Sequence, residues 1–228
     1  MNRKKSTGWL MITGALSIIL SYSLLIVKFE YPDILRQHPG TILTKFHNGN
    51  GLLIFIWWWF GVSALPLLVA FIKIGEWPET ASIKWVTTFG VIAGITQIIG
   101  LLRWVFVIPV LATSYVNAAD NVTKEIVVIN FKTIHQLGGV LIGEHIGQLF
   151  TIVWSVMISI AFLKREIVAR WISWLGLCAS SIYLLAQLEI FKTVIPEFPV
   201  FKAAGFVGST LWLIWLLCMG IAFSIRKS

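Results

Sequence analysis

Six apolar stretches, each near twenty residues or longer, dominate the sequence and restrict the folds open to it. They run approximately over 8–27, 51–72, 85–108, 134–163, 171–188 and 205–225. A helix that crosses the hydrocarbon core of a bilayer needs about 20 apolar residues, and no stretch alternates with the period of two expected of a barrel strand. A helix satisfies its backbone hydrogen bonds internally, as lipid surroundings require. We therefore predict an all-α polytopic membrane bundle of six transmembrane helices.

Composition agrees with this class of protein and excludes others. Hydrophobic residues make up 57% of the chain and charged residues 12%, whereas soluble domains are about one quarter charged. The net charge of +8 does not indicate a nucleic-acid partner, because basic residues flank the apolar stretches, where they orient the spans. Without internal repeats or a linker, residues 1–228 form a single domain. The expected partners are membrane lipids.

Lysine and arginine predict the orientation of the spans. Ten of the 18 lie at the N-terminus, in the second and fourth connections and at the C-terminus, including Lys84, Arg226 and Lys227, and seven lie in the other three connections. Cytoplasmic connections carry the excess of basic residues. We therefore predict that both termini are cytoplasmic and that the long connections around 28–50 and 109–133 lie outside.

Both long connections carry signs of local structure. Residues 42–46 form a short amphipathic piece that precedes a loop signal of alternating Asn and Gly at 48–51. Asp120 or Asn121 is placed to cap a helix through 123–131 that continues into the fourth span.

Polar and titratable residues within or beside the spans are the candidates for function, because such side chains are costly in lipid. They are His47 before the second span, Arg103 in the third, His135, Glu144, His145 and Gln148 in the fourth, and Glu189 ending the fifth. The predicted topology places them all in the outer half of the membrane or at its rim. Glu144 is nine residues beyond His135, about 13 Å deeper, which puts it near the midplane.

The fourth span has two informative faces. Gly139, Gly143 and Gly147 recur every four residues and form a small-residue ridge that permits close approach of another helix. Glu144 and Gln148 share a different face. Arg103 is the natural countercharge for Glu144, so we expect the two to pair or to share a ligand.

Three functions are compatible with these residues. The first is binding of a small amphiphilic or lipid-like ligand in an outward-facing polar cavity, formed by the seven candidates, with few polar groups in apolar walls. The second is a membrane-embedded enzyme that uses a metal or haem. We predict no metal site, but His47, His135, His145 and Glu144 would be its ligands. The third is a structural subunit without a ligand. No cofactor is identified by the sequence.

Three segments carry a resemblance to a known family. They are FEYPDILR at 29–36, GLLRWVF at 100–106 and HQLGGVLIGEHIGQLF at 135–150. In these the chain resembles bacterial membrane proteins grouped as domain of unknown function 4386, and the similarity extends over nearly the whole length, to WISWLG at 171–176. The resemblance implies a multi-pass protein of the bacterial inner (cytoplasmic) membrane and supplies no activity.

Overall fold

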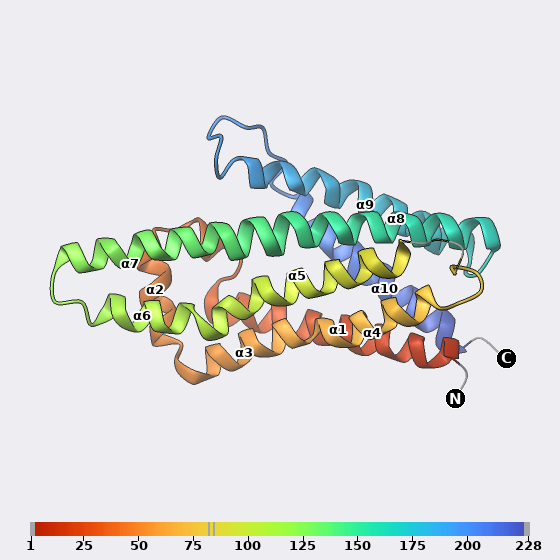
Figure 1. Cartoon of the computed structure of the whole chain (residues 1–228), viewed down its shortest axis with the longest axis horizontal. Helices are drawn as coiled ribbons and strands as arrows, with labels where there is room; N and C mark the ends of the chain where they lie inside the picture. Colours follow the sequence, from red (N-terminus) through yellow and green to blue (C-terminus); the bar gives the residue numbers. More distant parts are fainter. Residues whose placement is uncertain (1–2, 82, 84, 226–228) are drawn as a thin grey trace.

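A computed structural model describes residues 3–81, 83 and 85–225, so Lys84, Arg226 and Lys227 of the orientation argument lie outside the described residues. Every regular element within these ranges is helical, which confirms the all-α prediction (Figure 1). In chain order the elements are α1 (Arg3–Phe29), η1 (Asp33–Arg36), α2 (Pro39–Asn48), α3 (Asn50–Val62), α4 (Ala64–Gly75), α5 (Val86–Phe106), α6 (Ile108–Val116), α7 (Asn121–Ile134), η2 (His135–Ile146), α8 (Gly147–Arg165), α9 (Arg170–Phe191) and α10 (Ala204–Ile225).

The prediction of six spans is confirmed, since six helical segments of the described chain are long and apolar enough to cross a membrane. They cover Arg3–Phe29, Asn50–Gly75, Val86–Val116, Asn121–Arg165, Arg170–Phe191 and Ala204–Ile225. The start of α1 and the end of α10 lie at one end of the bundle, here called the terminal end, and the α6–α7 hairpin lies at the opposite, distal end (Figure 1). Which end faces the cytoplasm stays a prediction.

Two of the spans are composite because proline interrupts their hydrogen bonding. Pro66 follows the break between α3 and α4 at Ser63, and Pro109 follows the break between α5 and α6 at Val107. Proline has no amide hydrogen and its ring crowds the preceding turn, so it suits the start of a helix better than its interior.

The third and fourth spans are longer than predicted. Segment Val86–Val116 has 31 residues and Asn121–Arg165 has 45, because both helices continue into the α6–α7 hairpin. Asp120 caps α7 by accepting from the Thr123 amide at 2.7 Å and the Thr123 hydroxyl at 3.0 Å. These bonds hold the pKa of Asp120 below its ordinary value. The predicted capped helix that runs into the fourth span is therefore confirmed.

This extension changes the depth expected for Glu144. The midplane position predicted from the sequence rests on His135 as the outer start of the span. Counted instead from Lys164 at the terminal end, Glu144 is about 30 Å along the helix at 1.5 Å per residue. The hydrocarbon core is about 30 Å thick, so we now expect Glu144 near the distal rim of the bilayer and not at its midplane.

Two apolar clusters form the core. The terminal cluster includes Met11, Trp154 and Trp215, all with no exposed surface. The distal cluster includes Trp57 and Trp104, whose rings stack with centroids 4.6 Å apart. Several polar side chains of α5, η2, α8 and α9 lie along these helices between members of the two clusters or beside the distal one, and we call them the polar layer. Its members are Gln97, Arg103, Glu144, His145, Gln148, Tyr183 and Gln187.

Candidate functional site

Arg103 is the only charged side chain that is buried among the described residues, with 8% of its surface exposed. Its guanidinium donates to the carbonyl oxygen of Gly100 and, at 3.4 Å, to Nδ1 of His135, and it lies 5.4 Å from the ring centroid of Trp104. Its Nε is buried and has no hydrogen-bond partner among the described residues. Burying an unsatisfied donor of a charged group is costly.

The glycines of the fourth span make room for this side chain. A Cβ on Gly139 would overlap the guanidinium of Arg103, and one on Gly100 would lie 2.6 Å from the Cα of Gly143. The predicted glycine ridge therefore faces α5. The ridge lies in η2, a π-helix of 12 residues, which is long for a form that usually appears as a single turn, frequently at functional sites.

Glu144 is half-buried, and its carboxylate takes part in no hydrogen bond or salt bridge of the described residues. The predicted direct pair with Arg103 is not formed, although the two charges lie close enough to interact. The guanidinium instead donates to the carbonyl oxygen of Gly100 and to His135. That Arg103 and Glu144 share a ligand stays a prediction.

Tyr31, in the connection after α1, also belongs to this neighbourhood. Its ring packs edge-on against Trp57, with centroids 5.1 Å apart. Burial raises the pKa of Tyr31, and the nearby charge of Glu144 raises it further. The hydroxyl therefore keeps its proton and remains a hydrogen-bond donor.

His145 and Gln148 are held by Gln187 of α9. Nδ1 of His145 donates to the Gln187 amide oxygen at 3.0 Å, and the Gln187 amide nitrogen donates to Gln148 at 2.7 Å. The same nitrogen lies 3.5 Å from the carbonyl oxygen of Glu144. This network joins the fourth span to the fifth and leaves the Glu144 carboxylate uninvolved.

The remaining two predicted residues lie at the edge of the site or away from it. Glu189 accepts a hydrogen bond from Arg36 at 2.9 Å, and its negative charge lies close enough to Glu144 for the two carboxylates to repel each other. His47 lies in the last turn of α2, and no hydrogen bond or ring contact of the described residues joins it to the other six. Nor do any three His, Cys, Asp or Glu side chains in the described ranges approach closely enough to hold a metal ion. The conditional ligand set of His47, His135, His145 and Glu144 is therefore not assembled.

A comparison with protein families matches residues 6–220 to the domain of unknown function family DUF4386. The chain belongs to this family. The match covers nearly the whole chain and confirms the resemblance seen in its sequence. No curated protein and no solved structure matches, so the function of this DUF4386 protein has to be argued from its own residues.

Sequence reasoning missed two contributors to the site, Tyr31 and Arg36. Both lie in a polar connection without helical periodicity, and the partner of Arg36 is 153 residues away. The bond to Glu189 of α9 brings Arg36 to the site, and packing on Trp57 of α3 brings Tyr31 there. The exposed His38 caps α2 by accepting from the amide of Gly40 at 3.2 Å.

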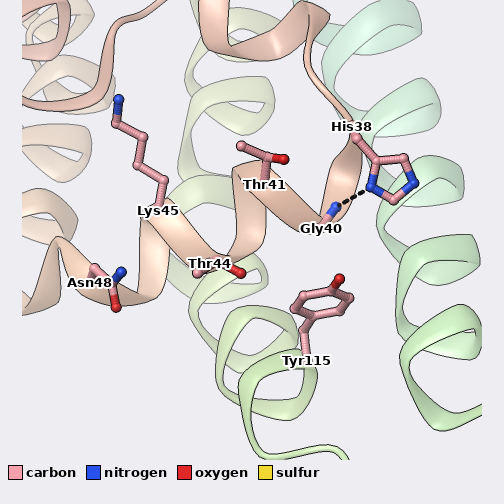
Figure 2. Close-up of a pocket in the computed structure, with 7 residues that line it drawn as sticks. All are labelled: His38, Gly40, Thr41, Thr44, Lys45, Asn48 and Tyr115. Carbon is pink, nitrogen blue, oxygen red and sulfur yellow. Dashed lines mark hydrogen bonds between the residues drawn. The ribbon is translucent and has the colours of Figure 1, made fainter. Parts of the chain in front are cut away.

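A surface hollow of about 500 Å³ lies between α2 and the end of α6 (Figure 2). It contains none of the predicted site residues. Gly40 permits the approach of the Tyr115 hydroxyl, since a Cβ there would overlap it, and Lys45 is paired with Glu30 at 2.6 Å. The side chains of Thr41 and Thr44 are exposed. These contacts fasten α2 to α6 and leave the polar layer as the candidate site.

Proposed function

We propose that the protein binds a small amphiphile whose polar head lies between Arg103 and Glu144 at the distal rim of the bilayer. The observation that supports this most is the incomplete pairing of two opposite charges. Arg103 is buried with an unsatisfied Nε, and Glu144 accepts no hydrogen bond, yet the two interact only at a distance. A scaffold without a ligand is expected to neutralise such charges by direct contact, because an unpaired buried charge is strongly destabilising.

The chemistry of the two groups defines the head that fits. An anionic oxygen would accept from the guanidinium in a charge-assisted hydrogen bond, and a hydroxyl or ammonium on the same head would donate to Glu144. His135 and Tyr31 add polar atoms beside these two charges. The ligand class is therefore an amphiphile with an anionic group and a neighbouring donor.

The surface beside the site suits the apolar part of such a ligand. Ile95 and Ile99 of α5 precede Arg103 on its terminal side, toward the hydrocarbon core, and are 44% and 51% exposed. An acyl chain that follows these side chains would stay in the hydrocarbon region. Apolar groups exposed to lipid there carry no unfavourable free energy of hydration. The head alone would enter the protein.

Quenching of tryptophan fluorescence tests this proposal, because Trp104 adjoins Arg103. The probes are dibromostearate and a dibromoalkyl-trimethylammonium of equal chain length, added to the protein in mild nonionic detergent. We expect saturable quenching by the carboxylate and not by the cation. Replacing Arg103 with Gln should weaken carboxylate binding by about 10- to 100-fold, as expected for a hydrogen bond to a charged group.

Lys132→Gln is the matched control, since it removes an exposed cation from the same end of the molecule. The control should bind dibromostearate as the natural protein does. Equal quenching by both probes, or unchanged binding by Arg103→Gln, would refute the proposal.

A further inference from the structure

The connection at 30–38, here called the strap, reaches from α1 across to α9. At its start, Tyr31 packs on Trp57 and on Tyr22, with ring centroids 5.1 and 5.5 Å apart. Near its end, Arg36 donates to Glu189 at 2.9 Å and to Asp33 at 2.5 Å. The strap is therefore anchored by Tyr31 and by the buried Ile34, and its hydrogen bond to α9 among the described residues is the ion pair of Arg36 with Glu189.

The distal end of α9 packs on α10, where Gly208 meets Tyr183, but its contacts toward the strap and η2 are mostly polar. The segment after it, 192–203, is almost entirely exposed and non-helical, and Figure 1 shows α9 diverging from α8 toward this end. Besides the Arg36–Glu189 pair, the hydroxyl of Thr193 accepts from Gln136 at 2.9 Å, and Gln187 joins α9 to the polar layer. Segments with few buried apolar contacts open most readily.

Each partner of the Arg36–Glu189 ion pair lies on a segment that also contributes a residue to the candidate site. Glu189 is two residues from Gln187, which bonds to Gln148 and His145. On the strap, Tyr31 lies close enough to Glu144 and Arg103 to interact with their charges. A separation of Arg36 from Glu189 would therefore part the strap from α9 directly beside the polar layer.

We infer that the strap and the distal end of α9 form a gate to the polar layer, latched by the ion pair between Arg36 and Glu189. What passes through the gate rests on the proposed function, whereas its opening does not. Both side chains are partly exposed, 54% for Arg36 and 36% for Glu189. A pair in water contributes little net stability, which suits a latch that has to open repeatedly.

Cysteine labelling measures the opening without any ligand. In a background with Cys178→Ala and Cys218→Ala, Gln187→Cys places a thiol at a position that is 5% exposed, and N-ethylmaleimide reports its accessibility in detergent. Arg36→Glu should raise the labelling rate about two- to fivefold, the range for losing one exposed ion pair. The swap Arg36→Glu/Glu189→Arg should restore the slow rate.

A control variant and a second reporter position test whether faster labelling has a cause other than opening of the gate. Arg170→Glu breaks the exposed pair of Arg170 with Glu166, 3.4 Å long and at the terminal end, and should leave labelling unchanged. Tyr183→Cys serves as a second reporter position, for the case in which Gln187→Cys itself loosens α9. Unchanged labelling in Arg36→Glu at both reporters, a swap that stays fast, or an equal effect of Arg170→Glu would overturn the gate.

The ligand arm separates this inference from the proposed function. Arg36→Glu should speed both association and dissociation of dibromostearate while its Kd stays unchanged, because a gate alters passage and not the bound state. Faster labelling without any probe binding supports the gate and refutes the proposed function. If the probe binds and the labelling rate is the same with and without Arg36→Glu, the proposed function is supported and the gate is refuted.

Discussion

The terminal and distal halves of the bundle pack in different ways. In the terminal half, Trp154 and Trp215 fill a core of apolar side chains, and the hydroxyl of Ser155 accepts from Trp212 at 2.8 Å. In the distal half, the one buried charge among the described residues, Arg103, lies beside a glycine-lined π-helix. We conclude that the terminal half contains the larger apolar core, and that the distal half combines a smaller apolar core with a polar site.

The largest effect on stability is expected in the terminal half. Trp154 has no exposed surface, and the centroid of its ring lies 3.9 Å from the ring centroid of Phe71. Trp154→Ala should lower the free energy of unfolding by about 3–5 kcal/mol, through lost contacts and the cavity left behind. Thermal unfolding in detergent measures the loss. A loss no greater than that of the exposed control Trp171→Ala would contradict the assignment of the terminal half as the stabilising core.

A smaller loss is expected where the two halves meet. Gly100→Ala would place a Cβ 2.6 Å from the Cα of Gly143, and backbone atoms cannot rotate away. We expect a destabilisation of about 1–3 kcal/mol, as for overpacked interiors, measured in the same unfolding assay. Gly51→Ala is the control, since its Cβ would meet nothing within 4 Å. If the two alanine variants are equally stable, α5 and η2 are not in close contact.

Removing the charge of Glu144, in the distal half, should not lower the free energy of unfolding as the two substitutions above do. Glu144→Gln keeps the shape of a half-buried side chain whose carboxylate has no hydrogen-bond partner in the described chain. We expect stability to stay equal or to rise by up to about 1 kcal/mol, because a half-buried carboxylate without a hydrogen-bond partner in the described chain is removed. Thermal unfolding without added lipid measures this change. A clear loss of stability would show that Glu144 has a structural role, like residues of the terminal half.

The smallest effect is a pH dependence confined to the α6–α7 hairpin. The folded-state pKa of Asp120 is lowered by bonds from Thr123, so its cap is fully present above the unfolded pKa of about 3.9. The cap is lost as the pH falls through the lower folded value. Nuclear magnetic resonance of residues 121–124 should show fraying only below about pH 4. Asp120→Asn should remove this pH dependence, and its persistence would rule out Asp120 as the cause.

Sequence periodicity and charge were sufficient for much of the architecture. Six spans, the Asp120 cap and the glycine ridge at 139, 143 and 147 all follow from local pattern, because helix formation in lipid depends on segment length and hydropathy. The same reasoning identified Arg103 and Glu144 as the costly residues. It assumed α-helical geometry at 135–146, where the structure has a π-helix.

The amino-acid sequence by itself determined that this chain crosses a membrane six times and carries charges that lipid does not tolerate. Only the tertiary structure decided that Arg103 turns to His135 and not to Glu144, and that Arg36 meets Glu189 across 153 residues. Hydropathy acts through each segment alone, so it can be read along the chain. The partner of a polar side chain depends on which helices pack together and at what height, and no local pattern contains that information.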